Sequence, residues 1–129
     1  MQMKAHFILY VEDQKRSMKF YRAVLGAEPI LDVPGMTEFR LSDDAVLGLM
    51  PEQGIKRLLG DSLPDPAPAR GIPRSEIYLV VDDARVYHDC AKENGAAELS
   101  SVQKRDWGHQ VGYVLDPDGH VLAFAEPGT

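Results

Sequence analysis

The chain has 129 residues and lacks several features that define large classes of protein. Its single cysteine, Cys90, excludes an internal disulfide and a CxxC zinc site, and fits a reducing compartment. The longest apolar run, near residues 45–50, is too short to cross a bilayer. The first residues lack the basic, apolar and small-residue order of a signal peptide. We therefore expect a cytoplasmic protein with no membrane partner.

An excess of positive charge is also lacking. Lysine and arginine number 14 against 20 aspartate and glutamate residues, which gives a net charge of −6. Because there is no basic run to neutralise phosphates, nucleic acid is not an expected partner. The HExxH, GxSxG, P-loop and GxGxxG patterns are absent as well, so those hydrolase and nucleotide-binding classes are not indicated. The length and the 44% hydrophobic content predict one globular domain with its own core.

Polar and apolar residues alternate along residues 4–11, which is typical of a strand with one face on a core. Asp13 can cap a helix that would end near Gly26. Turn-forming residues then separate three short predicted strands, at 28–33, 36–41 and 45–50. The second half repeats this order, with a predicted strand at 76–81, a helix after Asp83, and three more strands at 97–103, 110–115 and 120–126. Two similar β-α-β-β-β modules are therefore expected.

The segment between the two repeats has a different composition. Residues 52–74 hold four of the nine prolines and three glycines, which is typical of a linker or a long surface loop. A helical turn is predicted at 55–59. We therefore divide the single domain into module one at 1–51, a linker at 52–74 and module two at 75–129.

Three sequence motifs accompany this repeat. The first strand reads His6-Phe7-Ile8-Leu9-Tyr10-Val11-Glu12-Asp13, the first helix contains Ser17-Met18-Lys19-Phe20-Tyr21, and the last strand follows Asp116-Pro117-Asp118-Gly119-His120. In this order the motifs resemble the vicinal-oxygen-chelate superfamily, which includes glyoxalase I, bleomycin-resistance proteins, fosfomycin-resistance enzymes and extradiol dioxygenases. The resemblance implies an α+β fold in which two tandem βαβββ modules form a curved mixed sheet with helices outside. It also implies a ligand or metal in the concave cleft, and a homodimer.

In the metalloenzymes of that superfamily, the first and fourth strands of each half supply the metal ligands. Carried over by resemblance, these positions fall on His6, Gly48, Glu76 and Ala123. Neither Gly48 nor Ala123 has a side-chain donor atom, so two candidates remain, one fewer than a tightly bound catalytic metal normally has. We therefore expect no metal cofactor. A divalent metal at His6 and Glu76, completed by a partner chain or a substrate, is the alternative.

The same resemblance makes the polar face of the sheet the ligand site. Alternation places polar residues there, and the small residues at two metal positions would leave room for a ligand. Trp107 is expected at the rim, beside His109, which is either a solvated loop residue or a gate or general base. The predicted ligand-binding cleft comprises His6, Tyr10, Glu38, Arg40, Gly48, Arg74, Glu76, Tyr78, Trp107 and Ala123. His88 is expected to be solvated, with Val86, Tyr87, Cys90 and Ala91 on the inner side of its helix.

Three functions remain open at this point, and no catalytic residue is assigned. The first is a small-molecule binding protein resembling the bleomycin-resistance branch, which would sequester a drug or metabolite without a catalytic metal. The second is a metal-dependent lyase, isomerase or dioxygenase with an incomplete or shared site. The third is a scaffold with no ligand, which a cleft filled by its own side chains would favour.

Overall fold

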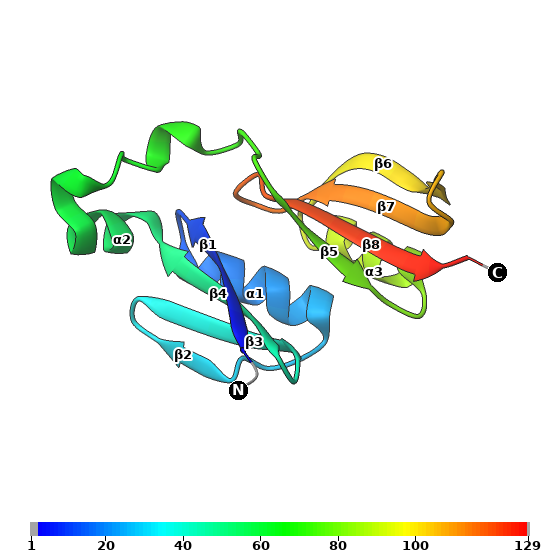
Figure 1. Ribbon diagram of the computed structural model, residues 1–129, viewed down its shortest axis with the longest axis horizontal. Helices are drawn as coiled ribbons and strands as arrows, with labels where there is room; N and C mark the ends of the chain where they lie inside the picture. Colours follow the sequence, from blue (N-terminus) through cyan, green and yellow to red (C-terminus); the bar gives the residue numbers. More distant parts are fainter. Residues whose placement is uncertain (1–2, 129) are drawn as a thin grey trace. The chain divides into compact units, whose positions relative to one another are not determined.

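The computed structural model describes residues 3–128 and divides the chain into two compact units (Figure 1). The boundary between the units falls after Arg70, and residues 23–25 are grouped with the second unit. Each unit carries one four-stranded mixed sheet. Within the described residues, no helix is long and apolar enough to cross a membrane.

The first unit has the order strand, helix and three strands: β1 (Ala5–Val11), α1 (Gln14–Leu25), β2 (Leu31–Val33), β3 (Met36–Ser42) and β4 (Ala45–Pro51). The strands lie in the order β1-β4-β3-β2, and only the β1–β4 pair is parallel. Asp13 accepts a hydrogen bond from the backbone N–H of Arg16, which caps α1 as predicted. The helix ends at Gly26, whose φ of 64° is the left-handed conformation that glycine adopts at low cost.

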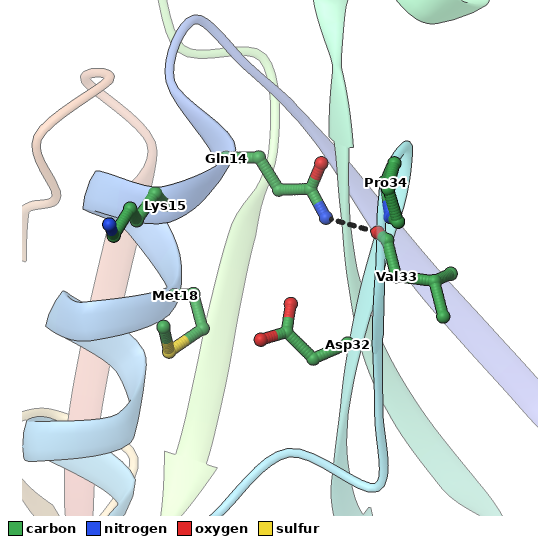
Figure 2. A pocket seen from close by; sticks show the side chains of 6 residues that line it. All are labelled: Gln14, Lys15, Met18, Asp32, Val33 and Pro34. Carbon is green, nitrogen blue, oxygen red and sulfur yellow. Dashed lines mark hydrogen bonds between the residues drawn. The ribbon is translucent and has the colours of Figure 1, made fainter.

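A single glutamine fixes the start of α1 to the β2–β3 hairpin. The Gln14 side-chain amide donates to the carbonyl oxygen of Val33 at 2.8 Å (Figure 2). It also donates to Oγ1 of Thr37 at 2.8 Å, and its oxygen accepts from the N–H of Gly35. Thr37 is fully buried and in turn donates to Asp32. These bonds satisfy the polar groups between helix and hairpin, so the side of the sheet that carries Thr37 is the helix side.

The second unit repeats the order: β5 (Glu76–Val80), α3 (Ala84–Glu93), β6 (Ala97–Lys104), β7 (His109–Leu115) and β8 (Val121–Pro127). Its strand order, β5-β8-β7-β6, matches that of the first unit position by position. Asp83 accepts from the N–H of Val86, and Glu126 accepts from the N–H of Ala84, so two carboxylates hold the start of α3. The α+β fold of two βαβββ modules is therefore confirmed.

The segment after β4 contains more regular structure than its prolines suggested. The predicted turn is part of an eight-residue helix, α2 (Glu52–Leu59), and 3-10 turns follow at Gly60–Ser62 and Ala67–Ala69. Lys56 donates to the carbonyl oxygens of Gly60 and Leu63, which closes the turn that follows the helix.

The prediction for the inner side of α3 is wrong in part. His88 is buried, with 2% of its surface exposed, whereas Val86 is 60% exposed and Cys90 is only half-buried. The imidazole Nε2 of His88 lies 2.7 Å from a carboxylate oxygen of Glu98 on β6, and a Cβ at Gly112 would lie 2.5 Å from its Nδ1. The helix is rotated toward this contact because Glu98 pairs with Nε2 of the buried imidazole and glycine leaves the ring space, while Nδ1 has no hydrogen-bond partner among the described residues.

Candidate functional site

Each sheet has a face opposite its helix, which we call the helix-free face. In the first unit this face carries His6, Ile8 and Tyr10 on β1, because strand neighbours alternate. Across the strands, Gly48 on β4 lies between Ile8 and Glu38. The metal positions carried over from the resemblance, His6 and Gly48, therefore share one face but are two residues apart in register.

The room expected at Gly48 is already filled. A Cβ built on Gly48 would lie 3.1 Å from Cγ1 of Ile8 and 3.3 Å from Sδ of Met36, and Gly48 itself is buried. Two apolar side chains thus cover the position at which the metalloenzymes carry a ligand. The expectation of an open space at this glycine is wrong, because neighbours on β1 and β3 occupy it.

The polar residues of this face pair with one another. Nδ1 of His6 lies 3.2 Å from Oε2 of Glu38, which brings an imidazole and a carboxylate together on adjacent parts of the face. Arg40 pairs instead with Asp43 in the turn that follows β3, where both side chains are exposed. Tyr10 is half-buried near the end of β1. Of the predicted first-half residues, the structure brings together His6 and Glu38.

In the second unit, two tyrosines enclose the other small residue. Ala123 on β8 lies between Tyr78 on β5 and Tyr113 on β7 in one row across the sheet. Ala123 is fully buried, as are Val111 and Ala125, and the two tyrosine rings pack on these three residues. The space above Ala123 is therefore covered by aromatic side chains, and the expected room is filled here as well.

Two more rings extend this layer at one end. The indole N–H of Trp107 donates to the hydroxyl oxygen of Tyr78 at 2.9 Å, and the same hydroxyl lies 2.6 Å from Nδ1 of His109. The rings of Tyr78 and His109 are stacked, with their centroids 5.9 Å apart. Trp107 is 57% exposed. We call Tyr78, Trp107, His109 and Tyr113 the aromatic layer.

Two charged residues beside the aromatic layer, Arg105 and Glu76, differ in their contacts. The Arg105 guanidinium lies over the Tyr113 ring, 5.2 Å from its centroid, and donates to the Val111 and Ser101 carbonyls and to the Ser100 hydroxyl. Glu76 is exposed at the start of β5. Burial, assisted by the negative charge of Glu76, raises the pKa of Tyr113 above its ordinary value.

The sequence predictions located part of this arrangement. Tyr78, Trp107 and Ala123 are brought together, and Glu76 acts electrostatically on Tyr113. Arg74 is exposed in the segment before β5. Tyr113 was missed, although alternation along β7 could have placed it on the same face as Val111.

The residues at the metal positions do not fit a metal centre. Gly48 and Ala123 offer no donor atom, and neighbouring side chains cover both positions. Across residues 3–128, no group of three or more histidine, cysteine, aspartate or glutamate side chains is arranged to hold a metal ion. Two of the four positions therefore supply no ligand, and the donor side chains at the other two are His6 and Glu76.

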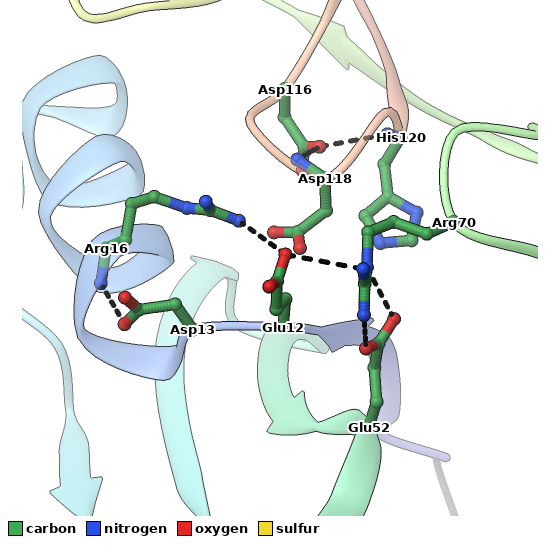
Figure 3. A network of polar contacts seen from close by, with 8 residues as sticks. All are labelled: Glu12, Asp13, Arg16, Glu52, Arg70, Asp116, Asp118 and His120. Atoms are coloured by element: carbon green, nitrogen blue, oxygen red, sulfur yellow. Dashed lines mark hydrogen bonds and ion pairs between the residues drawn. The ribbon is translucent and has the colours of Figure 1, made fainter. Parts of the chain in front are cut away.

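A separate pocket of about 380 Å³ lies in the first unit, where β4 meets α2. The buried carboxylate of Glu52 is paired with Arg70, and Arg70 also lies 3.5 Å from Glu12 (Figure 3). No sequence motif predicted this cluster. Because its most buried charge is already paired within the chain, it is a structural contact that fastens the 60–70 segment to the sheet.

Comparison with known proteins agrees with the topology. A structure of a glyoxalase-related enzyme from Fulvimarina pelagi superposes with a TM-score of 0.82 at 23% identity, covering 98% of this chain and 88% of that one. A glyoxalase/bleomycin resistance protein/dioxygenase family enzyme from Burkholderia phytofirmans gives 0.83 at 14% identity, covering 98% and 99%. A protein from Agrobacterium tumefaciens, solved by NMR, gives 0.74 at 27% identity and covers both chains completely.

No curated protein matches the sequence. A family model does match, from residue 5 to residue 124, which includes both modules and the strands that carry His6, Gly48, Glu76 and Ala123. Together with the repeated βαβββ topology, this match shows that the chain belongs to the Glyoxalase/Bleomycin resistance protein/Dioxygenase superfamily.

Proposed function

We propose that this chain is a small-molecule binding protein that holds a drug or metabolite with an aromatic part against the aromatic layer, without a catalytic metal. The observation that carries the proposal is the exposed indole of Trp107, fixed by its hydrogen bond to Tyr78 on the helix-free face. A rigid aromatic surface of this kind provides contact area at little cost in side-chain entropy.

The layer is built in advance of any ligand. Tyr78 and Tyr113 rest on the buried floor of Val111, Ala123 and Ala125. Arg105 is held by three neighbouring residues and in turn supports the Tyr113 ring. Since these contacts leave few rotamers free, a ligand would find the rings already oriented.

A scaffold with no ligand would share some of these features, because the covered positions at Gly48 and Ala123 fill the face with the chain's own side chains. The exposure of Trp107 favours binding instead. A packing residue would bury most of its indole, whereas 57% of the Trp107 surface is accessible.

Trp107 is the only tryptophan in the chain, so its fluorescence reports on the proposed site alone. A panel of small aromatic compounds, cationic and neutral, should include members that change this emission and raise the melting temperature in a concentration-dependent way. Tyr78→Phe should weaken binding, because the indole loses its acceptor. Tyr87→Phe is the matched control, since Tyr87 stacks on Phe124 on the helix side. A panel that changes neither signal would refute the proposal.

The enzyme alternative has one observation in its favour. His6 and Glu38 form an imidazole–carboxylate pair on the helix-free face of the first unit, which could exchange protons with a substrate. If a turnover is found, His6→Ala should abolish it without unfolding the chain. Binding at the aromatic layer would be untouched by that change.

We also propose that the protein is a homodimer in solution. This proposal rests on the family, whose members usually pair. Size-exclusion chromatography with light scattering would give twice the 14.3 kDa mass of the chain, and a monomer at every concentration tested would exclude it.

A further inference from the structure

One hydrogen bond of the aromatic layer has a fixed direction. An indole N–H can only donate, so the hydroxyl oxygen of Tyr78 accepts from Trp107. The direction of the second bond, between that hydroxyl and Nδ1 of His109, depends on the tautomer of the histidine. Its length of 2.6 Å is shorter than an N–H···O bond normally is, which favours donation by the Tyr78 hydroxyl and a chain that runs from Trp107 through Tyr78 to His109.

This direction determines the tautomer of the histidine. Nδ1 of His109 accepts a hydrogen bond, so the neutral ring carries its proton on Nε2. In this state the only hydroxyl proton of Tyr78 is donated to His109, so the hydroxyl cannot donate a hydrogen bond to a ligand.

Protonation of His109 reverses the second bond. The imidazolium has an N–H at both nitrogens, so Nδ1 becomes a donor to the Tyr78 oxygen. That oxygen then accepts from both Trp107 and His109, and its own proton must be donated elsewhere. Because Tyr78 is only half-buried, the free O–H is available to solvent or to a bound molecule.

We propose that protonation of His109 switches Tyr78 into a hydrogen-bond donor for the ligand. The site then takes small aromatic molecules that carry a neutral hydrogen-bond acceptor, such as a carbonyl oxygen, and binds them more tightly in acid. This inference rests on the proposed function, because it concerns the same site.

The charged and titratable groups around the switch come from several elements. On the same face, β5 contributes Glu76, and β7 contributes Tyr113. The loop before β7 contributes Asp106, which is exposed, and Arg105, whose guanidinium is already bound by its neighbours. The remaining charged residues lie on the strands adjacent to His109: Lys104, which is exposed on β6, and Glu126 on β8, which caps α3.

The first experiment needs no ligand. Long-range ¹H–¹⁵N NMR of the imidazole rings distinguishes the two neutral tautomers directly. At about pH 8, where a histidine is normally neutral, His109 should carry its proton on Nε2. In Tyr78→Phe this preference should weaken, and in the control Tyr87→Phe it should persist. A His109 ring protonated on Nδ1 at that pH would overturn the inference.

The second experiment tests recognition. Acetophenone carries a carbonyl acceptor and ethylbenzene does not, and neither titrates between about pH 5.5 and about pH 8, the range in which histidines normally change charge. The Trp107 indole N–H signal reports binding of both. Acetophenone should bind roughly 2- to 10-fold more tightly in acid, the factor expected for one hydrogen bond, and ethylbenzene should show no such difference.

Tyr78→Phe should weaken binding of both compounds to a similar extent, because the indole of Trp107 loses its acceptor, and should remove the pH dependence for acetophenone. If acetophenone binds equally at both pH values in the unmodified chain, the switch is refuted while the proposed function stands. If neither compound binds at either pH, the result counts against the proposed function and the recognition step together. The tautomer measurement then still decides whether the hydrogen-bond chain exists.

Discussion

The helix-free faces of the two units belong to sheets of the same topology but carry different side chains. At the position where the metalloenzymes carry a ligand on the fourth strand, the first unit has Gly48 and the second has Ala123. The first is covered by Ile8 and Met36, neither of which is fully buried, and the second by two tyrosines fixed on a buried floor.

This difference teaches that a small residue at a ligand position need not leave a hole in the face. Close packing is restored by neighbouring side chains, and the chemistry of those neighbours then defines what the face can do. In the first unit the result is an aliphatic cover with one histidine–glutamate pair. In the second it is a preformed aromatic surface. Four predictions test how far this contrast holds.

The largest effect is expected when a glutamate is restored at each small position. Ala123→Glu should lower the free energy of unfolding by about 3–5 kcal/mol, because a carboxylate would be buried beneath two tyrosine rings. Gly48→Glu should cost less, about 1–3 kcal/mol, since Ile8 and Met36 can move aside. Urea denaturation followed by circular dichroism measures both.

Ala123→Gln separates volume from charge, because it keeps the size of the glutamate without its ionisation. If the glutamine variant is as unstable as the glutamate one, overpacking is the main cause. If Gly48→Glu and Ala123→Glu lower the free energy of unfolding equally, this result contradicts the contrast between a partly exposed cover at Gly48 and a fixed one at Ala123.

The next effect concerns the ion pair at the end of β4 in the first unit. Arg70→Ala should destabilise the protein by about 2–3 kcal/mol, because it leaves the buried Glu52 carboxylate without its partner. Arg40→Ala removes an exposed ion pair with Asp43 and should cost at most about 0.5 kcal/mol. The double variant Arg70→Ala with Glu52→Gln should recover much of the loss. No recovery would show that Arg70 acts through other contacts.

The second unit should have an acid sensitivity of its own. The hydrogen bond from His88, together with the one from Lys92, lowers the pKa of Glu98 below its ordinary value of 4.5. A carboxyl whose folded-state pKa is depressed stabilises the fold above its unfolded-state pKa, and this contribution is lost as the pH falls through the folded-state pKa. The melting temperature of the unmodified chain should therefore drop on acidification below about pH 4.5 more steeply than that of Glu98→Gln.

Parallel curves for the two proteins would mean that Glu98 contributes nothing to the acid transition. Glu12→Gln, which alters an exposed carboxylate of the first unit, provides a comparison of similar charge change.

The smallest expected effect is that of metal ions. Because Gly48 and Ala123 carry no donor and are covered, zinc, nickel, manganese or ferrous iron should shift the melting temperature by less than about 1 °C. A concentration-dependent rise that disappears in His6→Ala and in Glu76→Ala would show that the metal alternative is correct and that a partner or substrate completes the site.

The sequence allowed the secondary structure to be predicted closely, because its signals are local. Alternation placed β1 and β5, aspartates at 13 and 83 marked both helix starts, and glycine at 26 marked the end of α1. The side on which α3 rests was not predictable in this way. Its buried histidine depends on Glu98 and Gly112, which come from other strands.

For the candidate site, several residues could be predicted from the sequence, but the contacts between them could not. Strand alternation assigned Tyr78 and Glu76 to one face, the family resemblance added Ala123, and the motif before β7 drew attention to Trp107. The joining of Trp107 and His109 through one hydroxyl was not visible, because it requires a side chain on β5 to reach the end of β7, 31 residues away.

The sequence by itself determined the two βαβββ modules, the family resemblance and the lack of a donor atom at two ligand positions, since these follow from periodicity, capping and residue type. Only the tertiary structure decided which side chains cover those two positions and which residues of the aromatic layer are joined by hydrogen bonds. The physical reason is that packing and hydrogen bonding are properties of neighbours in space, and the neighbours of Gly48, Ala123 and Tyr78 are supplied by other strands and loops.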